Sequence, residues 1–193
     1  TIFMMVTAER GYEKVVSAVE LAPDDYLIKP FSGEVLRTRL ERLVHKKTFL
    51  APIYELMERQ EMRKAAGMCD QRLKAAGPYL LDVLRLKGEL LLMISEFVSA
   101  SQVYERILAM RDIPWARMGL AQAQYFLENH AAAAEGFQQI IAEHPNYLSA
   151  YDWLAKAYTA LGDEAAAQRV LMDGVALSPR TLHRQKGLGE TAY

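Results

Sequence analysis

Two consecutive stretches of 34 residues decide the fold of this 193-residue chain. Residues 114–147 read PWARMGLAQAQYFLENHAAAAEGFQQIIAEHPNY, and residues 148–181 read LSAYDWLAKAYTALGDEAAAQRVLMDGVALSPRT. Aligned without a gap, the two stretches share five kinds of position: Leu120 and Leu154, Ala121 and Ala155, Ala133 and Ala167, Phe137 and Leu171, Pro145 and Pro179. A repeat of this length in alanine-rich sequence predicts helix pairs that stack on one another.

The residue types of the repeat have a packing explanation. Where two helices cross at their closest approach only a small side chain fits, so we expect Ala133 and Ala167 to be fully buried. A proline cannot continue the helix before it, so Pro145 and Pro179 should end the second helix of each pair. Each repeat is therefore predicted to be two helices joined by a short turn.

This pattern resembles the tetratricopeptide (TPR) repeat. We predict four such repeats, at about residues 46–80, 81–113, 114–147 and 148–181, and the first helix of a truncated fifth at 182–193. The small and large positions are filled by Ala65 and Cys69 in the first repeat and by Gly88, Ala100 and Tyr104 in the second. The predicted fold class is mainly α, with the repeats forming a right-handed helical superhelix.

The resemblance implies a groove that is lined by the first helix of each pair and binds a protein or peptide. The residues that it places in this groove are Arg85, Leu92, Met93, Trp115, Met118, Gln122, Tyr125, Phe126, Asp152 and Lys156. Aromatic residues and methionine are enriched at protein interfaces, although the same residues also pack between repeats. One TPR subfamily holds chaperone C-terminal carboxylates with a lysine and asparagine clamp. The matching pairs here are Arg85/Glu89, Met118/Gln122 and Asp152/Lys156, and none provides that clamp.

A different pattern opens the chain. The apolar run Ile2–Val6 predicts a strand, a helical stretch with apolar residues at Tyr12, Val15, Val16 and Val19 follows, and Asp24–Phe31 (DDYLIKPF) predicts a second strand. Lys29 is expected at the carboxyl end of this buried strand, where α/β sheets place ligand chemistry.

This order resembles the C-terminal half of a two-component receiver domain, a partial flavodoxin-like β-α-β-α unit over residues 1–47. The resemblance implies a phosphate-sensing role for Thr7, Tyr26, Lys29 and Pro30, and a cis peptide bond between Lys29 and Pro30. The acceptor aspartate and the acidic pair that binds magnesium would precede Thr1. We therefore expect no cofactor in this chain, because magnesium would need that missing half.

Composition and charge exclude several classes of function. The net charge of −1 and a pI near 6.4 give no field that would favour DNA or an anionic membrane. No apolar run approaches the roughly 18 residues that a membrane span needs, so we expect a cytoplasmic protein. His45, His130, His144 and His183 show neither metal spacing nor a partnered nucleophile, and we expect no catalytic site and no metal site.

The preferred functional hypothesis is part of a response regulator of a two-component phosphorelay, with TPR repeats as its protein-binding output and a sensor kinase as partner of the intact protein. The alternative is a constitutive TPR scaffold or adaptor whose receiver-like segment is degenerate. Half a receiver is too small to fold alone, since domains of about 60 residues are already marginal. We therefore expect residues 1–31 either to mediate self-association or to be poorly ordered.

Overall fold

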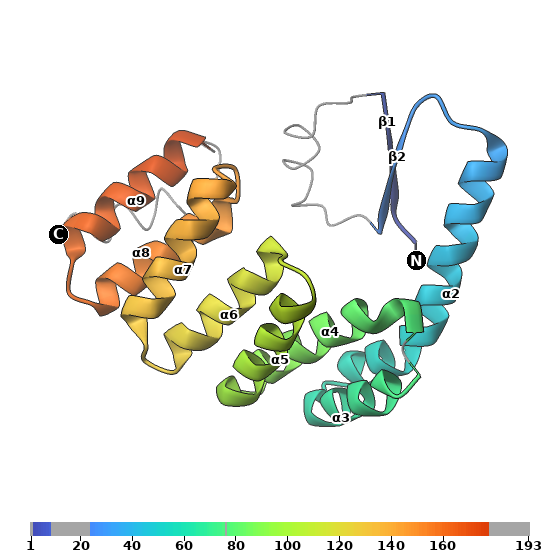
Figure 1. Cartoon of the computed structure of the whole chain (residues 1–193), viewed down its shortest axis with the longest axis horizontal. Coiled ribbons are helices and arrows are strands. Elements are labelled where there is room, and N and C mark those ends of the chain that lie inside the picture. Colours follow the sequence, from blue (N-terminus) through green and yellow to red (C-terminus); the bar gives the residue numbers. More distant parts are fainter. Residues whose placement is uncertain (1, 9–23, 76, 178–193) are drawn as a thin grey trace. The chain divides into compact units, whose positions relative to one another are not determined.

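The computed structural model describes residues 2–8, 24–75 and 77–177 (Figure 1). The chain divides into two compact units, Thr1–Gln60 and Glu61–Tyr193, which are described separately. Two predicted elements lie outside the described residues. They are most of the helix between the two N-terminal strands, which falls in 9–23, and the fifth repeat at 182–193.

The N-terminal unit contains two parallel strands. Strand β1 (Met4–Thr7) pairs with β2 (Asp25–Ile28), with Met4 opposite Asp25 and Thr7 opposite Ile28. The Lys29 amide donates to the Thr7 carbonyl at 2.8 Å, which extends the pairing by one residue. The Lys29–Pro30 peptide bond is cis, and this prediction is confirmed.

The expectation that β2 is a buried strand holds only for part of it. Leu27 is only 2% exposed, but its neighbour Ile28 is 45% exposed, and so is Val6 on β1. Val6 pairs with Leu27 and shares its face of the sheet, whereas Ile28 points to the other face, so both faces are partly exposed. The sheet of this unit has two strands in the described residues, and it does not establish a receiver domain.

Helix α2 (Gly33–Glu58) follows the sheet as a single helix of 26 residues. It begins where it does because the Ser32 Oγ accepts from the Val35 amide at 3.3 Å, an N-cap interaction. The predicted receiver helix and the predicted start of the first repeat near residue 46 both fall within it. Its basic side chains anchor it to β2, since Arg39 and Arg42 bind Asp25 at 3.0 and 3.3 Å.

The C-terminal unit is an array of helices (Figure 1). In order they are α3 (Met62–Leu73), α4 (Leu80–Met93), α5 (Phe97–Met110), α6 (Pro114–Phe126), α7 (His130–Glu143), α8 (Leu148–Ala160) and α9 (Glu164–Leu177), with a short 3-10 turn at Gly77–Tyr79 before α4. Helices α4, α6 and α8 begin at residues 80, 114 and 148, which confirms the period of 34 in this part of the chain.

The turn inside each pair also repeats. Ser95, Glu128 and Gly162 follow α4, α6 and α8 and have φ angles of 61°, 65° and 79°. A residue in this left-handed conformation reverses the chain and closes the helix end with hydrogen bonds to the last turn. Only the third position has glycine, the residue that adopts this conformation without steric cost.

The small positions of the repeat are buried as predicted. Ala65, Cys69, Ala133 and Ala167 are each 0% exposed. Burial raises the pKa of the Cys69 thiol to about 12, so this residue is a small core side chain and not a thiolate at neutral pH. The core of the array is thus built on residues that the repeat identified.

Tyr104 is wedged between two glycines of neighbouring helices. A Cβ atom added to Gly119 of α6 would lie 2.2 Å from the Tyr104 ring, and one added to Gly88 of α4 would lie 2.7 Å from it. Real Cβ atoms do not approach other atoms this closely, so both positions require glycine. The 2% exposed tyrosine ring therefore fixes the spacing of α4, α5 and α6.

Substitution of these glycines tests the wedge. Gly119→Ala should lower the free energy of unfolding by about 1–3 kcal/mol, because the added methyl group overpacks the Tyr104 site. Gly67→Ala is the matched control, since nothing lies within 4 Å of its Cβ position in α3. The control should raise the free energy of unfolding by about 0.5–1 kcal/mol through better helix propensity. Urea unfolding followed by circular dichroism measures both, and equal effects would contradict the wedge.

A second pair of variants tests the helix crossing in the last described repeat. Ala167→Leu should cost about 1–3 kcal/mol of unfolding free energy, because Ala167 is 0% exposed at the crossing of α8 and α9. Ala165→Leu adds the same atoms to an exposed position of the same helix and should change stability by less than about 0.5 kcal/mol. If both variants melted at the temperature of the parent chain, the register of the repeat would be wrong.

Candidate functional site

The first helices of the pairs line the inner side of the array. A few contacts join α4 to α6 and α6 to α8, and fewer join α5 to α7 or α7 to α9 in the described residues. Because α4, α6 and α8 approach each other more closely than the second helices do, the array curves toward them. Their shared surface, here called the inner face, is the place where the sequence predicts a partner groove.

At one end of the inner face, polar and charged side chains interact with one another. The Arg85 Nε donates to Glu89 at 2.8 Å, and the guanidinium lies 5.3 Å from the centre of the Trp115 ring. Burial works against the charge, but the hydrogen bond and negative charge of Glu89 outweigh it and raise the pKa of Arg85. Burial raises the pKa of Tyr147, and its hydroxyl also interacts electrostatically with Arg85 and Glu89. Arg85 is therefore compensated within the protein.

The other end of the inner face carries an aromatic cluster, defined by Phe97, Tyr125, Phe126, Phe137 and Trp153. The rings of Tyr125, Phe126 and Trp153 are mutually near-perpendicular, with centroid separations of 5.5, 5.5 and 5.6 Å. Phe97 stacks on Phe126 at 4.7 Å, and Phe137 lies 6.1 Å from Trp153. Edge-to-face and offset contacts of this kind stabilise the cluster beyond simple burial.

Two polar groups beside this cluster have no polar side-chain partner among the residues that the structure describes. The Lys156 ammonium sits 4.3 Å from the centre of the Trp153 ring and forms no ion pair with any described carboxylate. Gln122, which is half-buried on α6, makes no hydrogen bond to another described side chain. Donors and acceptors left open at a surface are available to a bound molecule.

The predicted groove residues divide into surface and core. Met93 and Phe126 are 59% and 41% exposed, and Arg85 and Lys156 are also exposed. The half-buried members of the predicted set are Leu92, Trp115, Gln122, Tyr125 and Asp152. Met118 is a correction, because it is only 6% exposed and packs in the core between α6, α7 and α8. It presents no surface to a partner.

Sequence reasoning missed Trp153, the centre of the aromatic cluster. It occupies the position 34 residues after Gly119, so the repeat predicts a small residue of the helix interface there. The sequence signal that could have identified Trp153 is that the preceding repeat has glycine at the corresponding position. The structure places its ring against Phe126 and Phe137, which come from the two helices of the preceding pair.

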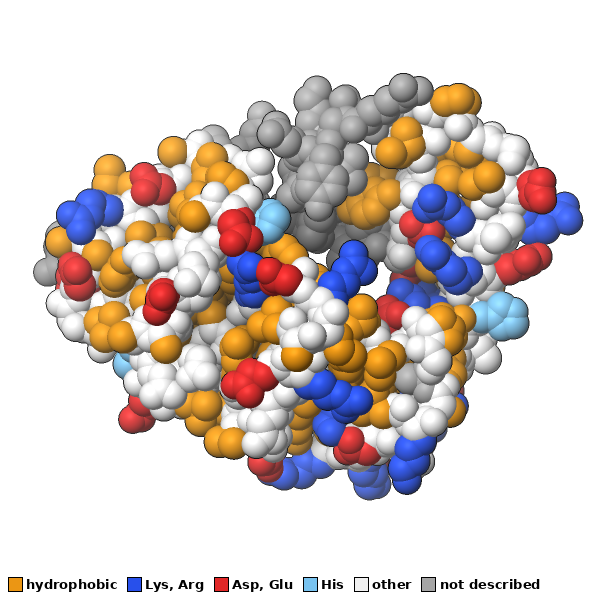
Figure 2. Space-filling model, viewed as in Figure 1, with side chains coloured by type: hydrophobic (Ala, Val, Ile, Leu, Met, Phe, Trp, Pro, Cys, Tyr) orange, Lys and Arg blue, Asp and Glu red, His pale blue; other side chains and the backbone are white. Residues whose placement is uncertain are grey.

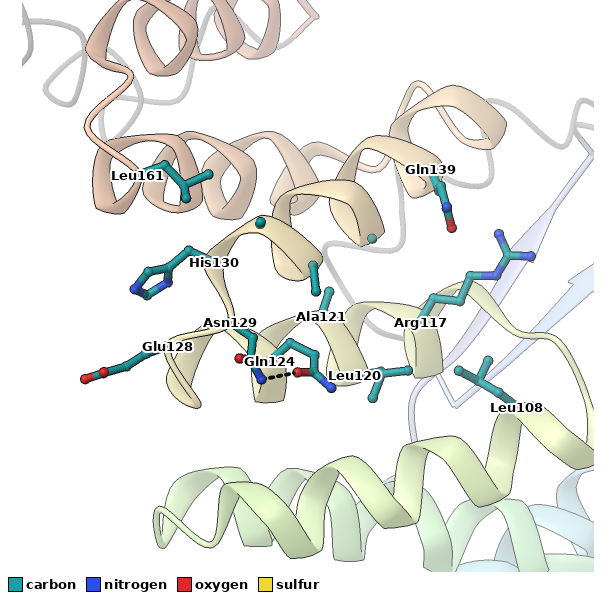
Figure 3. Close-up of a pocket in the computed structure, with 13 residues that line it drawn as sticks. Leu108, Arg117, Leu120, Ala121, Gln124, Glu128, Asn129, His130, Gln139 and Leu161 are labelled. Carbon is teal, nitrogen blue, oxygen red and sulfur yellow. Dashed lines mark hydrogen bonds between the residues drawn. The ribbon is translucent and has the colours of Figure 1, made fainter.

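A pocket of about 800 Å³ lies on the opposite side of α6 (Figure 3). Leu108 of α5, Leu120 of α6 and Ala132 of α7 give it apolar walls, and Gln124 accepts from the Asn129 amide at 2.8 Å beside it. Arg117 at its edge binds Asp112 and also Glu143, the latter at 2.7 Å. These contacts tie the loop before α6 to the end of α7, which makes Arg117 a structural residue.

The N-terminal residues predicted to sense phosphate are only partly brought together. Thr7 and Lys29 meet at the carboxyl ends of β1 and β2 through their backbone hydrogen bond. Lys29 and Pro30 are exposed, and Tyr26 is half-buried. The Tyr26 hydroxyl is buried without a hydrogen-bond partner, and burial raises its pKa.

Other kinds of site are not evident in the described residues. No group of three or more histidine, cysteine or acidic residues in residues 2–8, 24–75 and 77–177 could hold a metal ion. No helix in the same ranges is long and apolar enough to span a membrane. Acidic, basic and hydrophobic side chains are intermixed on the face shown in Figure 2.

Comparison with known proteins supports the helical-repeat fold. No family model and no curated protein matches the sequence. Among solved structures, MamA residues 41 to the end, from Desulfovibrio magneticus RS-1, is similar with a TM-score of 0.64 and 17% identity over 76% of this chain and 82% of that chain. The Sgt2 TPR domain from Aspergillus fumigatus gives 0.54 and 22% over 57% and 76%. The first TPR of Spaghetti (RPAP3), bound to an HSP90 peptide, gives 0.53 and 21% over 57% and 88%.

The fold and the inner face thus define a mainly helical array of TPR-like repeats. The comparisons provide no counterpart for a receiver domain, and the N-terminal unit contributes a small two-stranded sheet and helix α2. The structural similarity is at the level of the fold, since the identities lie between 17% and 22%.

The Arg117 contacts generate a prediction about pH. The hydrogen bond from Arg117 holds the pKa of Asp112 below its ordinary value of 3.8. A carboxylate with a lowered pKa stabilises the folded state above the unfolded-state pKa, and this contribution is lost as the pH falls through the lower, folded-state pKa. Arg117→Met should return the pKa of Asp112 toward 3.8 and remove that part of the acid dependence.

Carboxyl NMR titration of Asp112 measures this shift directly. Arg106→Met is the control, because it removes an exposed charge from α5 that makes no contact with Asp112. An unchanged Asp112 titration in Arg117→Met would show that the salt bridge does not persist in solution.

Proposed function

We propose that residues 61–177 form a protein-interaction module whose inner face binds a segment of another protein. The observation that carries the proposal is Phe126, an aromatic ring that is 41% exposed although three other rings of the aromatic cluster contact it. Exposed aromatic groups in a well-packed setting are typical of the centres of protein interfaces. The exposed Met93 and the open amide of Gln122 lie on the same set of helices.

The similar structures support an adaptor or scaffold, the alternative of the two functional hypotheses. The RPAP3 domain, by its title, is bound to an HSP90 peptide, which shows that this fold can accommodate a peptide. The present chain lacks the lysine and asparagine clamp for a terminal carboxylate, and Arg85 is already paired with Glu89. We therefore propose an internal segment of a partner as the ligand. The proposal assigns the chain no catalytic step, cofactor or metal.

A phosphorelay role is the second candidate. It is supported by the parallel pairing of β1 and β2, which brings Thr7 and Lys29 to one edge of the sheet. The carboxyl edge of a parallel sheet is where α/β proteins bind ligands. If further residues precede Thr1 in the protein, an aspartate at the carboxyl end of a preceding strand would support this role and a sensor kinase as partner. A different residue at that position would leave the adaptor role as the remaining hypothesis.

Peptide selection tests the binding function. Selection from random peptides displayed on phage should yield peptides that bind the full chain and compete with one another for one site. The Phe126→Ala variant should bind these peptides at least tenfold more weakly, a loss of about 1.4 kcal/mol. Gln139→Ala, an exposed change on α7 away from the inner face, is the control and should bind as the parent does. Absence of binders, or binders indifferent to Phe126→Ala and to Gln122→Ala, would refute the proposal.

A further inference from the structure

We infer that the inner face selects a segment in which an acidic side chain lies close to an apolar one. The apolar side chain would pack on Phe126 and Trp153, and the carboxylate would bind the Lys156 ammonium. This inference rests on the proposed function and adds the chemistry of the partner. Three observations carry it: the fixed orientation of the Phe126 ring, the Lys156 ammonium that pairs with no described carboxylate, and the lack of charged residues on the inner side of α6.

The Phe126 ring is held in place before any partner binds. Phe97 stacks on it with an interplanar angle of 10°, while Tyr125 and Trp153 contact it edge-on at 82° and 76°. Three contacting rings restrict its rotation, yet 41% of the residue stays exposed. A side chain that is already ordered loses little entropy when an apolar group packs on it.

Lys156 differs from the other cation of the inner face. Arg85 has Glu89 at 2.8 Å, whereas Lys156 has the face of Trp153 at 4.3 Å and no ion pair with a described carboxylate. A cation–π contact at an exposed site contributes about 0.5–1 kcal/mol, whereas a hydrogen bond to a charged group contributes about 1.5–3 kcal/mol. A carboxylate can therefore bind the ammonium while the lysine stem remains on the ring.

The surroundings of Lys156 disfavour a basic segment. The inner side of α6, with Trp115, Gln122 and Phe126, carries no charged residue. Glu89 is bound by Arg85, and Asp152, one turn before Lys156 on α8, has an interaction of its own. Since Glu89 and Asp152 have interactions and Lys156 pairs with no described carboxylate, Lys156 offers a positive charge beside the aromatic cluster.

The experiment uses the selected peptides and a charge reversal. The best peptide and a copy with each Asp and Glu replaced by Lys are measured by fluorescence anisotropy against the full chain, its Lys156→Glu variant and an Arg106→Glu control on α5. The parent and the control should prefer the acidic peptide at least tenfold. Lys156→Glu should lose that preference and bind the basic copy better. In a Trp115→Phe background, the acidic peptide should change the fluorescence of Trp153.

The outcomes separate this inference from the proposed function. In one outcome, peptide binding depends on Phe126 and yet is unchanged by the charge of the peptide and by Lys156→Glu. That result would overturn the acidic specificity and leave the proposed interaction module intact. Equal loss of the acidic preference in the Arg106→Glu control would show a general charge effect and would also overturn the inference. Failure to select any peptide that depends on the inner face would refute the proposed function, and the inference with it.

Discussion

The array depends on how closely its helices approach one another. Tyr104 can lie between α4 and α6 only because Gly88 and Gly119 leave room for its ring. In the next pair the corresponding large residue, Phe137, is completely buried and meets Trp153. Protein interiors are packed as densely as organic crystals, so the size of one side chain at such a crossing fixes the separation of whole helices.

This packing also creates the candidate site. Because the first helices approach each other more closely than the second helices do, residues of α4, α6 and α8 share one surface. Trp153 fills a position that is glycine in the preceding repeat, and its ring contacts those of Tyr125 and Phe126. A local departure from the repeat thereby supplies the ring that Phe126 contacts and over which the Lys156 ammonium lies.

In the N-terminal unit, a short motif predicted the local structure correctly but was not sufficient to identify a protein family. The stretch from Asp24 to Phe31 predicted a strand that ends at a lysine, and the structure confirms the strand, its parallel partner and the cis peptide bond. The same motif suggested a receiver domain, for which the comparisons give no support. Two paired strands are an element common to many α/β folds, so they do not distinguish one family from another.

The sequence by itself determined the period, the helix pairs and the buried small residues of the array. It could do so because helix crossings require small side chains at a fixed spacing. Ala133, Ala167 and the corresponding residues of the other repeats have that spacing. Position in the repeat also predicts which helix face a residue occupies, and most residues predicted for the groove are exposed or half-buried on the first helices.

Only the tertiary structure decided which of those residues are open to a partner. Met118 and Phe126 are both large apolar residues predicted for the groove, yet the first is 6% exposed and the second 41%. The difference arises from neighbours that come from other helices, which no pattern within one repeat encodes. The same holds for Lys156, because its contact with Trp153 and the lack of a described carboxylate partner depend on how the side chains pack in three dimensions.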